Sequence, residues 1–182
     1  MTVGPGGGAA PDRWPEPTTL LASAGWVLRL PFGSVVLADP SSGPGTEQIS
    51  LPGDILLTLI PDQRVRRVGE LLEWTQHEAR RFVTDRAGDA LAEGAIRMAG
   101  RDAYACLVGF DGHTGQRWIV AAVGVLRAGS FLGLLVLWPV VDPAQEPDLA
   151  LVRRVAAAAD VGDPDGAGRP RTGADVRRGK QE

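Results

Sequence analysis

Residues 93–141, EGAIRMAGRDAYACLVGFDGHTGQRWIVAAVGVLRAGSFLGLLVLWPVV, decide the fold. Four β-prone runs lie in this stretch, at 93–99, 103–110, 117–126 and 131–141. The turns between them are short and rich in glycine, so each can only reverse the chain. The stretch therefore predicts a C-terminal β-meander of antiparallel strands.

The third and fourth runs are apolar on both faces, as the alternation of Val120 and Ala122 with Ile119 and Ala121 illustrates. Strands of this kind lie at the centre of a sheet that is covered on both sides. Two helices can each cover one face, or both can cover the same face and leave the other as an apolar surface for a partner. The sequence leaves both arrangements open.

Working outward, two segments have the period of amphipathic helices. The first spans 68–86, and its apolar stripe follows three- and four-residue steps. The second spans 149–159 after Pro147 and Asp148. Shorter extended runs at 26–30, 34–38 and 49–60 add strands before the first helix. The predicted class is α+β: a mostly antiparallel sheet of about 5–7 strands packed with two main helices as an α/β/α sandwich.

The two ends differ from the middle in composition. Residues 1–25 are rich in Gly, Pro, Ala and Thr, and residues 162–182 lack apolar periodicity, so both are predicted to be disordered. The folded unit is then a single domain over 26–161. Neither a charged n-region nor an apolar h-region opens the chain, which predicts a cytoplasmic protein.

Composition limits the class of function. The net charge is −3 and no long basic run occurs before the tail, which argues against a nucleic-acid partner. Lys180 is the sole lysine and asparagine is absent, a bias typical of a high-GC genome that indicates an actinobacterial origin. Trp118 and Trp138 lie within a long apolar stretch, 118–141, which could span a bilayer. Arg127 near its middle would cost about 2.5–3.5 kcal/mol there, so a soluble hairpin is the favoured interpretation.

No catalytic, cofactor or metal motif emerges. Asp111 and His113 share one turn, and a metal site would need further ligands nearby. Cys106 alternates with core residues on a strand, which predicts a small buried hydrophobe rather than a nucleophile. Ser130 is one place out of register for a nucleophile elbow. Glu70 and Glu73 lie beside arginines on a polar helix face, which predicts a solvated surface.

Three tryptophans are the candidate partner-binding residues: Trp74, Trp118 and Trp138. Trp74 falls on the flank of the first helix, outside its apolar stripe and among charges, as aromatic anchors of interfaces do. The alternative is that Trp74 packs under a neighbouring loop.

The order of elements and the run AIRMAGRDAYACL at 95–107 resemble the PsbP/DcrB-like superfamily of small α/β/α sandwiches. The resemblance extends over residues 51–161 and consists of spacing, so it transfers no binding residue. It implies a non-enzymatic role, because members act mostly as assembly factors, adaptors, lipoproteins or chaperones, including chaperones for effectors of contractile secretion machines. The first hypothesis is therefore a cytoplasmic protein-binding adaptor or chaperone-like factor that serves such a secretion or injection machine. Two alternatives stay open: a small-ligand binder or enzyme with a pocket near Asp111, His113 and arginines, and a membrane-associated protein inserted through 118–141.

Overall fold

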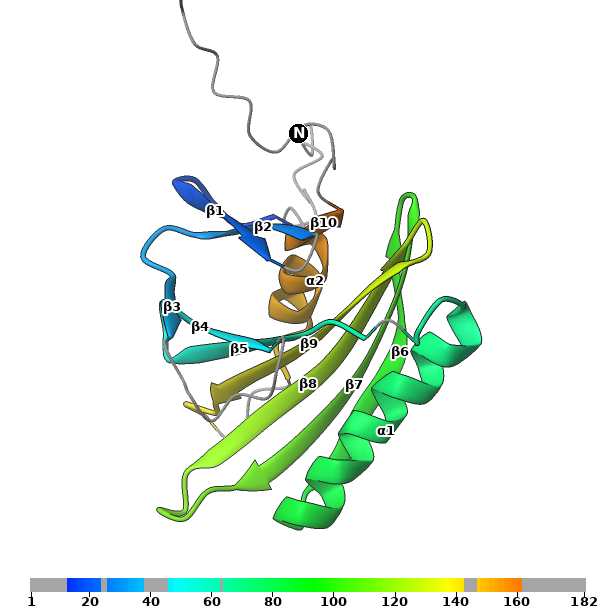
Figure 1. Cartoon of the computed structure of the whole chain (residues 1–182). Helices are drawn as coiled ribbons and strands as arrows, with labels where there is room; N and C mark the ends of the chain where they lie inside the picture. Colours follow the sequence, from blue (N-terminus) through cyan, green and yellow to red (C-terminus); the bar gives the residue numbers. More distant parts are fainter. Residues whose placement is uncertain (1–12, 24–25, 38–45, 63, 143–146, 162–182) are drawn as a thin grey trace, which may run out of the picture.

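A computed structural model describes residues 13–23, 26–37, 46–62, 64–142 and 147–161. Within these ranges the chain forms two helices and ten strands. A seven-stranded sheet has the order β3-β4-β5-β9-β8-β7-β6, and a three-stranded sheet has the order β1-β2-β10 (Figure 1). The strands are β1 Thr18–Ser23, β2 Trp26–Pro31, β3 Val35–Leu37, β4 Glu47–Leu51, β5 Ile55–Ile60, β6 Asp89–Met98, β7 Arg101–Asp111, β8 Arg117–Arg127, β9 Ser130–Pro139 and β10 Ala159–Val161. The helices are α1 Val68–Arg86 and α2 Leu149–Ala158.

The meander β6-β7-β8-β9 is antiparallel throughout, as the sequence predicts. Ala128 and Gly129 take positive φ values of 49° and 77° in the turn between Arg127 and Ser130, the geometry that a tight right-twisted hairpin requires. The apolar stretch 118–141 is thus mostly a hairpin of β8 and β9, and the inserted-helix alternative is wrong. Neither helix described is long and apolar enough to span a bilayer.

Helix α1 begins where a carboxylate satisfies free backbone donors. Glu70 accepts hydrogen bonds from the N–H groups of Arg66 and Arg67 at 2.7 and 3.0 Å. The bond from Arg66 is the main reason why the pKa of Glu70 lies below its usual value. The helix ends at Ala87, whose left-handed conformation lets the N–H bond back to Val83.

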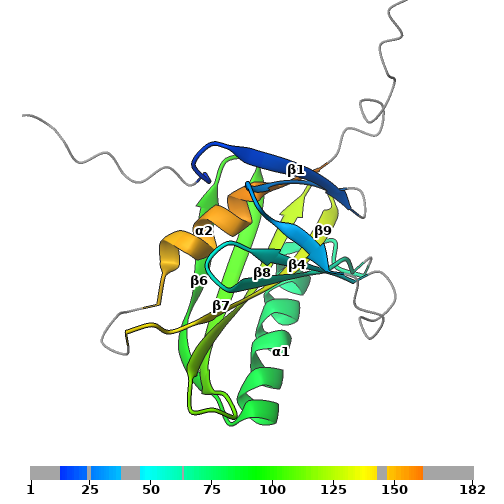
Figure 2. The ribbon, with the colours of Figure 1, turned by 90° about the vertical axis from the view of Figure 1, so that its left-hand side faces the viewer.

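The two helices cover opposite faces of the large sheet (Figures 1 and 2). Helix α1 packs on β7 and β8 through Leu71, Thr75 and Ala79. Gly124 in β8 and Gly133 in β9 are register partners, and they admit the side chains of Leu71 and Trp74 close to the strand backbone. Close approach of α1 therefore depends on this pair of glycines.

Helix α2 covers the other face together with the three-stranded sheet. Asp148 caps its first turn by accepting a 2.9 Å hydrogen bond from the Leu151 N–H. Its apolar stripe joins the largest core cluster, which also takes the inward residues of β2, β4, β5, β7, β8 and β9. The structure thereby decides between the two arrangements that the sequence leaves open: each face has its own helix.

The predicted α+β class and the α/β/α layering are confirmed. The strand count exceeds the expected five to seven because β1 and β10 build a second sheet on β2. Strand β1 falls inside the predicted leader, since six residues of ordinary strand composition, TTLLAS, pair fully with β2. Residues 1–12 and 24–25 of that leader, and the predicted tail at 162–182, lie outside the described residues.

Candidate protein-binding edge

Strand β6 is the longest edge strand among the described residues, with ten residues against six or fewer in β1, β3 and β10. It pairs with β7 on one side, and the sheet order places no strand on the other. A bulge between Ala90 and Ala92 sets Leu91 out of register, and the Leu91 side chain is 40% exposed. The outer backbone N–H and C=O groups of β6 thus face away from the sheet.

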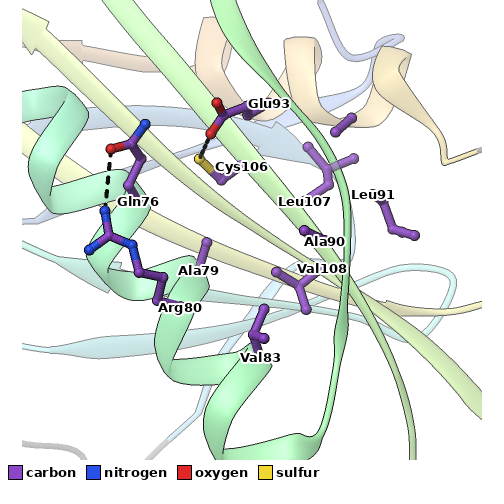
Figure 3. Close-up of a pocket in the computed structure, with 11 residues that line it drawn as sticks. Gln76, Ala79, Arg80, Val83, Ala90, Leu91, Glu93, Cys106, Leu107 and Val108 are labelled. Atoms are coloured by element: carbon purple, nitrogen blue, oxygen red, sulfur yellow. Dashed lines mark hydrogen bonds between the residues drawn. The ribbon is translucent and has the colours of Figure 1, made fainter.

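A groove with a volume of about 380 Å³ separates β6 from the C-terminal half of α1 (Figure 3). Ala79 and Val83 of α1 form one wall, and Leu91 and Glu93 of β6 form the other. Cys106 closes the floor with its Sγ 3.6 Å from a Glu93 carboxylate oxygen. Burial, and then the charge of Glu93, raises the pKa of Cys106 to about 12, so the thiol stays protonated and is no nucleophile.

Two further grooves follow the same strand. Beside the N-terminal half of α1, a groove of about 410 Å³ is lined by Val68, Leu72 and Tyr104 together with Ala95 and Met98. Its walls are largely apolar. The edge strand therefore has a groove along each half of α1.

On the opposite face, α2 and β6 enclose a groove of about 440 Å³. Ile96 and Leu149 supply apolar walls, and Arg153 supplies charge. Arg153 forms no ion pair with a described residue. Arg97, next to Ile96 in β6, directs its side chain to the α1 side of the sheet. The α2-side groove therefore offers one cationic group beside an apolar floor.

Four of the ten exposed large apolar side chains among the described residues lie around this edge, and four others, Phe32 and Val35–Leu37, lie in and just before β3. Val68, Val83, Leu91 and Leu149 are between 37% and 47% exposed, and each lines one of the three grooves. An added strand directs successive side chains to opposite faces of a sheet. A strand laid along β6 would thus place alternate side chains in the α1-side and α2-side grooves.

The other edge of the large sheet is short. Strand β3 has three residues, Val35–Leu37, and all of them are exposed. Natural sheets protect edges by keeping them short. Strand β3 therefore offers at most three outward positions, where β6 offers a strand of ten.

The three tryptophans predicted to bind a partner lie in separate places. Trp138 is 8% exposed and belongs to the α2-side core. Trp74 packs edge-on against Phe131, with ring centroids 5.0 Å apart, on the α1 side of the sheet. Trp118 packs at the margin of the cluster under α1. The fold does not bring the three into one surface, and it packs Trp74 on strands β8 and β9 rather than under a loop.

The candidate chemical groups are dispersed too. His113 is exposed, while Asp111 and Asp89 both pair with Arg117, at 3.4 and 3.0 Å. Ser130 ends the β8–β9 turn and pairs with Arg127. Among the described residues, no group of three or more His, Cys, Asp or Glu side chains could hold a metal ion.

Sequence reasoning missed the β6 edge because it started that strand at residue 93. The motif Asp89-Ala-Leu-Ala precedes it, and the bulge at Leu91 breaks the strict alternation that marks a strand. Gly88, directly after the helix, is the signal in the sequence that could have ended the helix there and placed the strand start earlier.

Comparison with solved structures assigns the fold. Over 81% of this chain and 97% of the other, it is similar to the Saccharomyces cerevisiae Ran-binding protein Mog1p, with a TM-score of 0.57 and 12% identity. Over 88% and 98%, it is similar to cyanobacterial PsbP (CyanoP) from Synechocystis sp. PCC 6803, with a TM-score of 0.55 and 12% identity. The fold is that of the PsbP-like group, as the resemblance in the sequence predicts. No protein-family model and no curated protein sequence matches.

Proposed function

We propose that this chain is a non-enzymatic protein-binding module of the adaptor or chaperone-like type, and that it holds an extended segment of a partner along β6. The observation that carries the proposal is the ten-residue edge strand with apolar grooves on both of its faces. The sequence resemblance implies a narrower form of this proposal, in which the module acts in the cytoplasm and serves a secretion or injection machine. Mog1p, a Ran-binding protein of the same fold, supports the general class.

The chemistry of the edge specifies the partner segment. Its backbone would continue the sheet, and apolar side chains at alternate positions would fill the grooves beside Leu91 and Leu149. Arg153 in the α2-side groove forms no ion pair with a described residue, so a carboxylate on the segment would complement it. The partner is therefore an extended segment with alternating apolar residues and an acidic residue.

The test is capture of the partner by tagged protein from the source organism, with matched edge variants. Ala95→Lys places a charged side chain at an exposed position of β6, a device by which natural edges resist strand addition. Val36→Lys makes the same change on β3 and is the control. Unfolding curves of both variants should match the parent protein.

The expected result is one dominant partner, bound by the parent and by Val36→Lys and lost from Ala95→Lys. A peptide from that partner should then compete for binding only when it carries the alternating apolar pattern. Equal retention by both variants, or selective loss from Val36→Lys, would overturn the assignment to β6. Absence of any partner from the parent capture would overturn the adaptor function.

A further inference from the structure

A separate cleft, on the far side of α2 from the groove that α2 and β6 enclose, is lined by arginines. It lies between α2 and the three-stranded sheet and has a volume of about 550 Å³, the size of a small-molecule site. Four arginines reach it from four parts of the chain: Arg13 before β1, Arg29 in β2, Arg101 in β7 and Arg154 in α2. The acidic residues of the lining are Glu16 and Asp160. Four cationic side chains thus face two anionic ones.

The positive charges of the cleft are only partly compensated. Arg29 lies 4.0 Å from Glu16, and Arg154 lies 3.6 Å from Asp148, outside the lining. Asp160 forms ion pairs with both Arg101 and Arg127, so one carboxylate serves two guanidinium groups. Arg13 forms no ion pair with a described residue. Arg101 also donates to the carbonyl oxygens of Ala157 and Ala159, which fixes it at the end of α2. Burial, and then the positive charge of Arg127, lowers the pKa of Arg101. A further negative charge in the cleft would relieve this repulsion.

Two buried donors here have no acceptor. The Arg154 guanidinium lies over the Trp14 ring, 5.1 Å from its centroid. Trp14 Nε1 and Arg154 Nε are buried, and neither meets a hydrogen-bond acceptor in the described part of the chain. A buried donor without an acceptor costs about 1–3 kcal/mol. Both donors are therefore unsatisfied, and an oxygen acceptor that reached either of them would recover part of this cost.

We propose that this cleft binds a small molecule through an oxyanion, a phosphate or a carboxylate group, which Arg154 and Trp14 hold by their free N–H donors and Arg29 and Arg13 hold by charge. Arginine forks match both kinds of group. Entry of the oxyanion requires Trp14, Arg154 or the side chains around them to move, because both donor atoms are buried. Binding is thus coupled to the environment of a tryptophan.

Neighbouring arginines on α2 make the test specific. Arg153 and Arg154 are consecutive, yet Arg153 lines the β6 groove and Arg154 lines the arginine cleft. Inorganic phosphate and citrate are titrated separately into the parent protein, Arg154→Gln and Arg153→Gln, at constant ionic strength set with sodium chloride. Binding is followed by calorimetry, and the fluorescence change due to Trp14 is identified with Trp14→Phe.

The expected result is saturable binding of phosphate or citrate to the parent, weakened about tenfold or more in Arg154→Gln and unchanged in Arg153→Gln. The preferred anion tells a phosphate ligand from a carboxylate ligand. The fluorescence change should vanish in Trp14→Phe, and the affinity measured by calorimetry should fall because that variant lacks the indole N–H donor. Lack of saturation by either anion, or equal weakening in the two arginine variants, would overturn the proposal. Partner capture at β6 is measured separately, so either proposal can fail alone.

Discussion

Packing of α1 on the large sheet predicts a sharp difference between two glycine substitutions. A Cβ added at Gly124 would meet Leu71 Cδ1 well inside contact distance and Thr75 Oγ1 at 2.9 Å. A Cβ added at Gly94 in β6 would meet nothing within 4 Å. Gly124→Ala therefore overpacks the interface under α1, while Gly94→Ala tests the same chemical change in an open strand position.

The magnitude follows from two opposing terms. Overpacking a core costs about 1–3 kcal/mol, and the severe overlap at Gly124 places it at the upper end. Alanine in place of glycine in a strand raises the free energy of unfolding by about 0.5–1 kcal/mol, because the chain loses less backbone entropy on folding. The net loss for Gly124→Ala is about 2 kcal/mol, or about 4–8 °C in Tm for a chain of this size. Gly94→Ala should equal the parent protein or gain up to about 1 kcal/mol.

The assay is urea unfolding followed by circular dichroism, with thermal melts as a second measure. Unfolding slopes should be the same for all three proteins, so that midpoints compare stability directly. If Gly124→Ala unfolds at the midpoint of Gly94→Ala, α1 does not rest on the glycine pair of β8 and β9, and the account of this face is wrong.

Three further outcomes are expected. In the same urea assay, Trp74→Ala should lower the free energy of unfolding by about 2 kcal/mol and Trp138→Ala by roughly 3–5 kcal/mol. Trp74 is half-buried against Phe131, whereas Trp138 is 8% exposed, so the reverse order would refute these placements. Cys106 should resist alkylation at about pH 8 in the native protein and react in urea, since its pKa is raised to about 12; rapid labelling of the native protein would contradict its burial. The contribution of this pKa shift to the free energy of unfolding should fall as pH rises from 9 towards 12. Glu70→Ala should have a lower free energy of unfolding than the parent protein at about pH 7. The gap between the two proteins should narrow as pH falls through the depressed pKa of Glu70, because a protonated carboxyl no longer caps the helix as an anion; a gap independent of pH would refute the cap.

The fold was largely predictable because its elements are locally encoded. The helix predicted at 68–86 has the bounds of α1, and the β8–β9 hairpin follows from Gly129 within a long apolar run. Strand β10 was not predictable, since it has three residues and is stabilised by pairing with β2, far away in sequence. Strand β1 pairs with its neighbour β2, but it follows a segment rich in Gly and Pro, whose composition predicted disorder up to residue 25.

The candidate site was less accessible. The β6 grooves arise because α1 packs mainly on β7 and β8 and covers little of β6, and no periodicity in the sequence reports on which strand a helix packs. The arginine cleft likewise joins Arg13, Arg29, Arg101 and Arg154, which are spread over most of the domain. The three tryptophans were predicted to bind a partner because large aromatic side chains anchor many interfaces, but the fold uses them largely for packing.

Hydrogen–deuterium exchange of the backbone amides in the partner complex tests the central claim most directly. Strand addition at β6 predicts slower exchange across 89–98 on binding, with no change in β3 and with the effect absent in Ala95→Lys. Protection confined to β3, or to the exposed face of α1, with 89–98 exchanging as in the free protein, would contradict it.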